Sequence, residues 1–207
     1  MDWTHWLVIL SAIISISGAS FYIRNTIKGK TKPNRVTWSM WALAPLLGTA
    51  AAISAGADYW ATLRIFLAGF MPLLVFLASF VNRKSYWKLT LFDGISGICS
   101  LGAIVVWAAI SSPVLAILFA AIADGFASLP TLKKAWKYPE TETGITYIAG
   151  FVAVLLVLPS IPVWNIENSA FQIYLLIVTT LLVLAVYRNR IFRKKGQQSA
   201  EKISKTR

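Results

Sequence analysis

A carboxyl group inside an apolar run is the feature of this sequence most able to do chemistry. Asp124 lies in the apolar run 113–132, six residues before Pro130 and so about 9–10 Å from the expected end of its helix. A charge in hydrocarbon is costly, and burial favours the neutral acid, so Asp124 is a candidate carrier of a coupling proton. Two other interpretations stay open: the carboxylate binds a cationic group of a solute, or it reaches a lysine or a backbone donor near the helix end.

Three further residues are candidates for contact with a solute or a proton. Trp41 lies one helical turn beyond Trp38, where it could stack on a ligand or anchor its helix at the membrane interface. Gln172 is a polar group in the last apolar run. Asp93 begins the run 91–110, where an acidic side chain complements the helix dipole, so capping competes with a role in transport.

The residue sets of most enzymes and metal proteins are missing from the sequence. Cys99 is the only cysteine and His5 the only histidine, so the chain can form neither an internal disulfide nor a histidine–cysteine metal site. It has no dinucleotide-binding or phosphate-binding motif. We therefore expect no enzyme activity, no metal and no cofactor.

The composition is that of a membrane domain. Hydrophobic residues make up 57% of the chain and charged residues 14%, against roughly 25% in a typical soluble domain. The uncharged runs approach the ~20 residues that a helix needs to cross a bilayer, and only helices pair all backbone groups of such runs in lipid. The sequence thus predicts an all-α, polytopic membrane protein with seven transmembrane helices, at 3–23, 36–56, 62–81, 91–110, 113–132, 144–163 and 170–187.

The basic residues predict the orientation of these spans. All Lys and Arg residues except Arg64 lie in the first, third and fifth connections and in the tail, which the positive-inside rule assigns to the cytoplasm. The N-terminus is then outside and the C-terminus cytoplasmic, and the short loops suit a bacterial inner membrane. This pattern also explains the net charge of +12 without nucleic acid, which needs a basic face on a folded surface.

Small residues recur four apart along the first two spans. They are Ser11, Ser15 and Ala19 in the first and Gly48, Ala52 and Gly56 in the second. Because such stripes let helix backbones approach closely in lipid, we expect both to pack against other helices.

A shift of 109 residues brings two stretches of the chain into register. Each stretch ends one apolar run, forms a basic connection and begins the next run, with Arg24 aligned on Lys133 and Trp38 on Tyr147. Parallel repeats of this kind occur in transporters. The repeat predicts a three-helix unit at 1–89, a linker helix at 90–111, a second three-helix unit at 112–190 and a basic cytoplasmic tail at 191–207.

The second copy of the repeat resembles the PQ-loop motif, in which a proline near the cytoplasmic end of a helix precedes a basic connection and a Ser/Thr–Glu step into the next helix. The residues that carry the resemblance are Pro130, Thr131, Lys134, Pro139, Glu140, Thr141 and Glu142. The first copy is divergent, with Phe21 in place of the motif proline. In topology the chain is similar to the SWEET-like (MtN3/saliva-type) seven-helix membrane proteins.

The resemblance implies a transporter or facilitator of a small polar solute, in which two three-helix halves rock around a central cavity. Pro130, Pro45 and Pro159 are candidate hinges, because a proline removes one helical hydrogen bond; static kinks are the alternative. Glu140 and Glu142 lie among the lysines of the fifth connection, where salt bridges that latch the cytoplasmic face compete with a solvated loop.

The sugar-binding pattern of the SWEET transporters is incomplete in this chain. The third span has no asparagine before Asn82 and the sixth has no central tryptophan, so the solute stays open. The alternative function is a non-transporting membrane receptor or assembly protein of the same fold, and a homo-oligomer is compatible with both. A polar cavity shared by the halves and lined by Asp124 would favour a transporter, and a dry apolar centre would favour the alternative.

Overall fold

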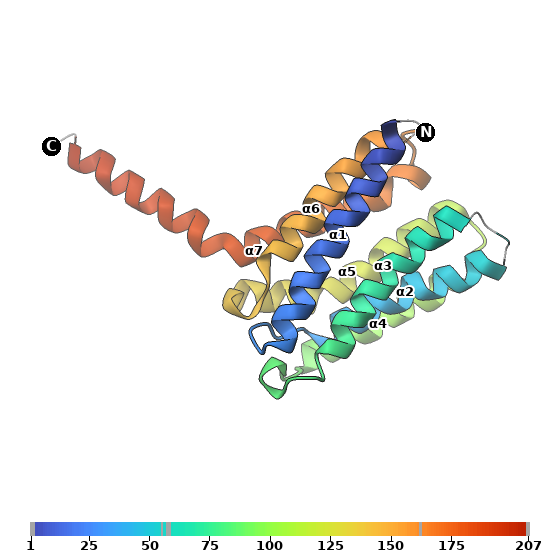
Figure 1. The fold of residues 1–207 in the computed structure, drawn as a ribbon, viewed down its shortest axis with the longest axis horizontal. Helices are drawn as coiled ribbons and strands as arrows, with labels where there is room; N and C mark the ends of the chain where they lie inside the picture. The colour runs from blue at the N-terminus through green and yellow to red at the C-terminus, as the bar shows by residue number, and fades with distance from the viewer. Residues whose placement is uncertain (1–2, 55, 57–58, 162, 206–207) are drawn as a thin grey trace.

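The computed structural model describes residues 3–54, 56, 59–161 and 163–205, with side chains described at these positions except 4–5, 59–64, 113, 167 and 192–205. Within this part of the chain the backbone forms seven α-helices, so the all-α prediction is confirmed (Figure 1). His5 and Arg64 have side chains outside the described set, as do the basic residues of the tail 191–207 beyond Ile191. The helices are α1 (Trp3–Ile27), α2 (Arg35–Ser54), α3 (Tyr59–Ala78), α4 (Leu91–Ala109), α5 (Pro113–Lys137), α6 (Gly144–Val157) and α7 (Ile166–Lys205), with 3-10 turns η1 (Arg83–Ser85), η2 (Pro139–Thr141) and η3 (Leu158–Ser160).

Five helical segments are long and apolar enough to cross a membrane. They are Trp6–Ile27, Arg35–Ser54, Leu91–Ala109, Val114–Lys137 and Asn168–Ile191. Two further apolar helical segments, Ile65–Ala78 and Gly144–Ser160, are shorter. By length and composition these are the helices of an integral membrane protein. The count of seven spans stays a prediction.

The surface of α4 shows how the chain meets lipid. Leu91, Ile98 and Val105 share one face of this helix and are 81%, 73% and 62% exposed. On the opposite face Ser96 and Ser100 are buried, at 3% and 1%. Apolar side chains outside and hydroxyl groups inside reverse the pattern of a soluble helix, and this arrangement is stable where hydrocarbon is the solvent.

Several helices continue past the ends of their apolar runs. The run 113–132 was expected to end near Pro130, but α5 continues to Lys137. Lys133, Lys134 and Lys137 therefore lie in the last turns of α5 rather than in the connection, where their charges complement the negative end of the helix dipole. Asp124 consequently lies 13 residues before the end of the helix, about 20 Å at 1.5 Å per residue, so the expected distance of 9–10 Å is wrong.

The prolines lie in different kinds of structure. Pro45 and Pro130 lie inside α2 and α5, as the hinge hypothesis requires. Pro159 lies in the 3-10 turn η3 that follows α6, because α6 ends at Val157, before its predicted end at 163. Pro72 interrupts α3 in the same way as Pro45 interrupts α2, and it was not among the predicted hinges.

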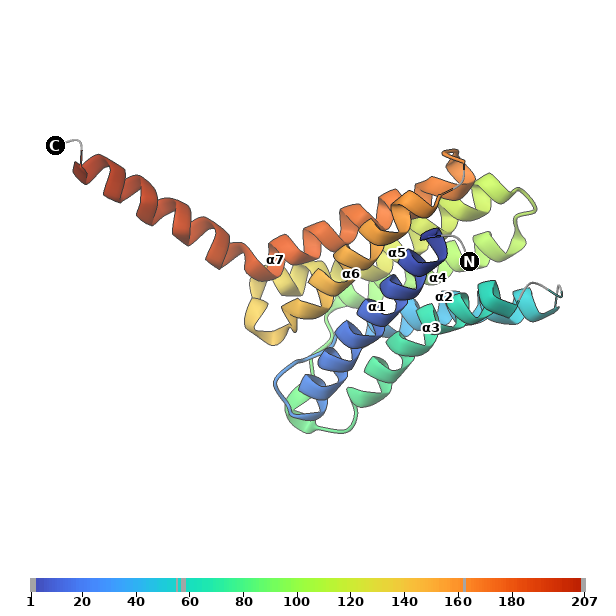
Figure 2. The same ribbon diagram turned by 45° about the horizontal axis from the view of Figure 1, so that its top comes forward.

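The same packing order occurs twice along the chain. Helix α3 packs against both α1 and α2, and helix α7 packs against both α5 and α6. Between these groups α1 packs against α6 and α2 packs against α5, while α4 contacts α5 and α2 (Figures 1 and 2). Gly18 allows the α1–α6 contact, because a Cβ atom added there would lie 2.5 Å from the Cβ of Ala149.

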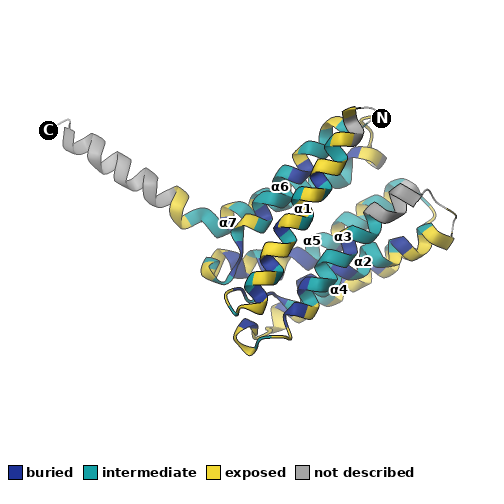
Figure 3. Cartoon of the chain, viewed as in Figure 1, coloured by how far each residue is buried: buried dark blue, intermediate teal, exposed yellow. Residues whose placement is uncertain are grey.

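One end of the bundle gathers three connections, 28–34, 79–90 and 138–143, and we call this end the basic face. In Figure 1 it lies at the lower left, and the α1–α6 pair and the α2–α3 pair diverge away from it. The main core cluster lies near this end and takes one residue from each of five helices: Tyr22, Trp38, Val75, Tyr147 and Leu182. Figure 3 shows buried residues among the connections and helix ends at the basic face.

Candidate functional site

A cavity of about 390 Å³ lies between α1, α3, α6 and α7. Pockets that bind small molecules have volumes of roughly 300–1,000 Å³, so a small organic solute fits. The cavity follows α1 from Val8 to Ala19, and toward the opposite face it reaches Val157 at the end of α6. At the basic face it reaches Trp38 of α2 and Thr146 of α6.

The cavity wall is mainly apolar, with a few neutral hydrogen-bonding groups. These are Ser11 and Ser15 on α1, Thr146 on α6, and Gln172 and Thr179 on α7. The hydroxyls of Thr146 and Thr179 donate to backbone carbonyl groups at 2.7 Å, and each retains its capacity to accept a hydrogen bond. None of the described lining residues is charged, so an ion would find no counter-charge in this wall.

The small-residue stripe of α1 has a role other than the predicted one. Ser11, Ser15 and Ala19 line the cavity, where their short side chains leave space rather than admitting a neighbouring helix. In α2, by contrast, Gly48 does pack, since an added Cβ would lie 3.6 Å from Ile65 and 3.9 Å from Trp107. Gly56, the last residue of the predicted stripe, lies beyond the end of α2, and a Cβ atom added there would meet no atom within 4 Å. The spacing of small residues therefore did not decide between a helix contact and a cavity.

At the basic face, beyond the end of the cavity, a buried glutamate holds three side chains. The Glu142 carboxylate forms an ion pair with Lys134, with 2.5 Å between Nζ and Oε1, and these two side chains are 1% and 0% exposed. Its other oxygen, Oε2, accepts hydrogen bonds from the hydroxyls of Tyr22 and Tyr147, both at 2.7 Å. We call Glu142, Lys134, Tyr22 and Tyr147 the Glu142 network.

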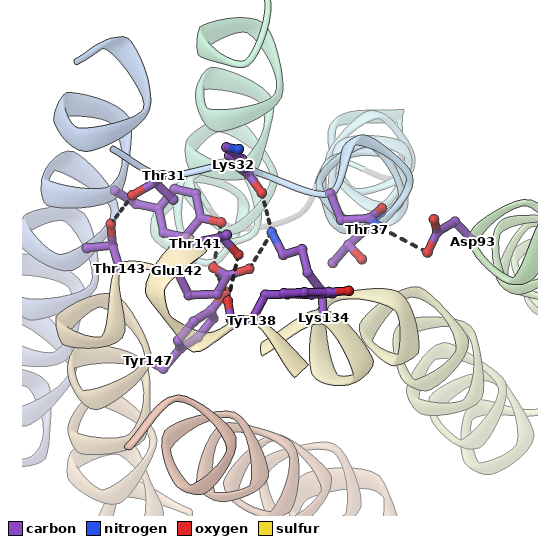
Figure 4. A network of polar contacts seen from close by, with 12 residues as sticks. Thr31, Lys32, Thr37, Asp93, Lys134, Tyr138, Thr141, Glu142, Thr143 and Tyr147 are labelled. Carbon is purple, nitrogen blue, oxygen red and sulfur yellow. Dashed lines mark hydrogen bonds and ion pairs between the residues drawn. The ribbon is translucent and has the colours of Figure 1, made fainter. Parts of the chain in front are cut away.

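Further contacts beside this network join the α1–α2 connection to the α5–α6 connection (Figure 4). The Lys134 ammonium group donates to the carbonyl of Lys32, whose own amide donates to the carbonyl of Thr141 at 2.9 Å. The hydroxyls of Thr31 and Thr143 lie 2.5 Å apart, and the Asn25 amide donates to the Thr143 hydroxyl at 3.1 Å. Every contact in this group pairs a residue before position 35 with one after position 133.

The local sequence explains why Lys134 and Glu142 meet. The Tyr138 amide closes α5 by donating to the carbonyl of Lys134 at 2.7 Å, and Pro139 opens the 3-10 turn η2. Proline suits the first position of such a turn, because its φ is fixed and the missing N–H would have no partner there. The Glu142 amide then donates to the Pro139 carbonyl at 3.1 Å, so the chain folds back beside the last turns of α5.

Two aromatic residues connect the cavity to the Glu142 network. Trp38 lines the cavity, and its ring centroid lies 4.6 Å from that of Tyr22. Tyr147 follows Thr146, which lines the cavity, and its ring stands edge-on to Tyr22 at 6.4 Å. The end of the cavity and the network thus share a continuous packed cluster.

Asp124 lies in a separate cluster with Trp41, and neither residue lines the cavity. The Tyr174 hydroxyl of α7 donates to its Oδ2 at 2.6 Å. Trp41 of α2 also interacts with this carboxyl group, although its indole N–H makes no hydrogen bond of good geometry. Among the described side chains no basic group forms an ion pair with Asp124. The structure therefore does not support the interpretation in which the Asp124 carboxylate reaches a lysine.

Asp93 occupies a capping box at the start of α4. Its Oδ2 accepts from the amide and the hydroxyl of Thr90, at 2.6 and 2.9 Å, and its own amide donates to the Thr90 hydroxyl at 3.3 Å. Its Oδ1 accepts from the Asn34 amide at 3.1 Å. The capping interpretation of Asp93 accounts for the Thr90 contacts, and the Asn34 contact joins the start of α4 to the start of α2.

The structure separates the predicted site residues into different environments. Of the candidates for a solute or proton, Gln172 lines the cavity, Asp124 and Trp41 lie together beside it, and Asp93 caps a helix. Of the motif residues, Lys134 and Glu142 form the buried pair, while Glu140 is exposed. Thr131 is fully buried, and its hydroxyl has no hydrogen-bond partner.

Sequence reasoning missed the three tyrosines of these clusters. Tyr22 and Tyr147 lie in the two stretches related by the 109-residue shift, and their position next to the helix ends was the available signal. Tyr174 gave no signal, because its partner Asp124 is 50 positions away. Phenol groups in apolar runs read equally well as interfacial anchors.

Comparison of the chain with protein-family models, with curated proteins and with solved structures finds no significant match.

Proposed function

We propose that this protein is a membrane transporter of a small polar solute that works by alternating access. The observation that carries this proposal is a cavity of about 390 Å³ between the helices, with the buried Glu142 network across one end. A binding space that is blocked on one side is what a carrier needs in one of its two states. Because the described wall offers neutral donors and acceptors without a counter-charge, the proposed solute is uncharged.

The proposal takes the protein as two three-helix halves, 1–89 and 112–190, joined by a linker helix. The repeated packing order of α1–α3 and α5–α7 supports this division. So does one pair of contacts: Lys134 and Asn25 occupy equivalent positions under the 109-residue shift, and each reaches into the connection of the other half. These features are also those expected of a PQ-loop, SWEET-like protein, a membership that we retain as a hypothesis.

We infer that the basic face is cytoplasmic. These connections and the helix ends beside them carry every lysine and arginine between positions 24 and 137 except Arg64, as the positive-inside rule requires of cytoplasmic segments. The cavity then extends toward the outside, and the N-terminus lies outside. A bacterial inner membrane fits the short connections.

A non-transporting receptor or assembly protein of the same fold is the second candidate. The observation that favours it is the mainly apolar cavity wall, from which Asp124 is absent. Under this function the cavity would hold a ligand or a lipid chain without passing it across the membrane.

Uptake into liposomes distinguishes the two functions. The purified protein would be reconstituted and tested with sugars, neutral amino acids and organic acids. We expect uptake of an uncharged solute by the wild type and its loss in Ser15→Phe, which fills the cavity. Ser17→Phe is the matched control, because Ser17 is exposed on the same helix and does not line the cavity. A folded wild-type protein that takes up no solute of the panel would favour the receptor or assembly function.

A pH gradient in the same assay tests the proton-coupling hypothesis for Asp124. Since Asp124 does not line the cavity, we favour a proton over a cationic solute as its ligand. Asp124→Asn should then abolish the stimulation of uptake by an inward proton gradient, while exchange of solute without a gradient persists. Equal stimulation of the wild type and the variant would remove Asp124 from the coupling mechanism.

A further inference from the structure

The Glu142 network has the position of a gate. Trp38 and Thr146 mark the end of the cavity near the basic face, and the buried side chains Tyr22 and Tyr147 follow directly behind them. Tyr22 is 0% exposed and Tyr147 4% exposed, so no open path passes between these rings to the connections beyond. A solute that leaves the cavity at the basic face has to pass through this cluster.

The contacts of the network join two parts of the chain that are distant in sequence. Tyr22 comes from α1, whereas Lys134, Glu142 and Tyr147 come from α5, the following connection and α6. The flanking pairs Thr31–Thr143 and Lys32–Thr141 make the same connection. If the two halves move apart at the basic face, these contacts break together.

The chemistry of the network suits a reversible closure. A buried ion pair adds little net stability over a well-packed apolar contact, because desolvation of the charges offsets their attraction. When water enters, both charges and both hydroxyls regain hydration, so opening costs less than exposing an apolar surface of similar size. Pro130, one turn before Lys134 in α5, removes a backbone hydrogen bond and lets the end of this helix tilt.

We propose that Glu142 is the latch of this gate: its carboxylate holds Tyr22 of the first half and Lys134 and Tyr147 of the second, and it must release Tyr22 before the cavity opens at the basic face. The proposal rests on the proposed function only in treating the cavity as a solute pathway. Glu142 is a positioning residue, since it does not line the cavity and acts on the relative position of the helices.

Accessibility of the cavity from each side of the membrane tests the latch. Cys99→Ala removes the only cysteine, and Ser15→Cys then reports on the cavity. A membrane-impermeant thiol reagent would be applied to right-side-out and to inverted vesicles. In the parent protein, Cys at position 15 should react from the side opposite the basic face.

Glu142→Gln, which removes the charge and retains the shape, should shift this reactivity. We expect modification from the basic face to become faster by on the order of tenfold or more, and modification from the opposite side to become slower. Glu140→Gln is the matched control, because it removes a charge from an exposed residue of the same connection. Unchanged reactivity in Glu142→Gln would overturn the proposal, and so would faster reaction from both sides, which indicates loosened structure rather than an open gate.

A cross-link gives a second test that does not depend on the stability of Glu142→Gln. Asn25→Cys and Thr143→Cys, combined with Cys99→Ala, would link the last turns of α1 to the α5–α6 connection across a contact that the side chains already make. Formation of the disulfide by oxidation should stop the solute from leaving the cavity at the basic face, and reduction of the disulfide should restore this release. Undiminished passage in the oxidised protein would overturn the latch. The accessibility assay uses no solute, so it tests the latch separately from transport. A shift in accessibility without any transport would contradict the proposed function but support the latch.

Discussion

Single side chains carry the candidate chemistry of this protein, and their partners distinguish their roles. Asp93, Asp124 and Glu142 are all carboxyl groups in or next to apolar helices. Asp93 accepts from backbone and hydroxyl donors of a helix start, Asp124 accepts from one phenol, and Glu142 pairs with an ammonium group. Of these three, only Glu142 forms a buried ion pair. Its removal therefore leaves a buried charge without a partner, which should lower the free energy of unfolding more than removal of the other two.

Removal of the Glu142 side chain should destabilise the folded protein strongly. In Glu142→Ala the Lys134 ammonium group stays buried without a counter-charge, and we expect a loss of about 3–5 kcal/mol in the free energy of unfolding. Glu140→Ala, at an exposed position, should change it by less than about 0.5 kcal/mol. Thermal unfolding in detergent measures both.

The double variant Lys134→Met with Glu142→Leu separates the energy of the pair from the cost of an unpaired charge. Two apolar side chains of similar size remove both charges, so the part of the loss that comes from the unpaired lysine should return, whereas the hydroxyls of Tyr22 and Tyr147 stay without an acceptor. A double variant as unstable as Glu142→Ala would show that the shape of the network, rather than the unpaired lysine, sets its stability.

At the scale of elements, the helices of this chain are set by apolar runs and interrupted by prolines. Pro45, Pro72 and Pro130 lie inside α2, α3 and α5, and each removes one hydrogen bond from the middle of a helix. Pro130 is the one next to the Glu142 network, and it precedes the segment that carries Lys134. A hinge here would move the latch without distorting the cavity wall.

Pro130→Ala should stiffen α5 and slow transport. Alanine restores the N–H that can bond the carbonyl of Phe126, so we expect an unchanged or higher melting temperature together with a lower rate of uptake. Pro113→Ala, at the first position of the same helix, should affect neither, because no N–H is used there. An unaltered uptake rate in Pro130→Ala would identify a static kink.

For the whole molecule, the contact between α1 and α6, together with that between α2 and α5, joins the two groups of helices. Gly18 lies at this crossing, where an added Cβ would lie 2.5 Å from Ala149. A Cβ atom added at Gly102 of α4 would meet no atom within 4 Å. The two glycines therefore form a matched pair, one inside the assembly of helices and one on its surface.

Gly18→Ala and Gly102→Ala should change stability in opposite directions. Alanine at position 18 forces the helices apart, at a cost of about 1–3 kcal/mol, whereas at position 102 it favours the helix by up to about 1 kcal/mol. Unfolding of both variants in detergent provides the comparison. Equal effects would mean that the α1–α6 crossing does not limit how the helices pack.

The sequence by itself determined the properties that depend on local composition. The seven predicted apolar runs each overlap one of the seven α-helices in the described part of the chain. Lys133, Lys134 and Lys137 were assigned to the connection after the fifth run, but the helix continues through them. The alternation of runs and basic connections also predicted a repeated unit, and the packing order of the helices is compatible with it.

Only the tertiary structure decided which polar groups meet. Glu142 was one of two glutamates among several lysines, and the fold alone selects it over Glu140 by burying it against Lys134 and Tyr22. Likewise, the small residues of α1 face a cavity, and Asp124 lies outside it. The physical reason is that a helix in lipid gains nothing by burying apolar surface, so its orientation is set by contacts with side chains distant in sequence.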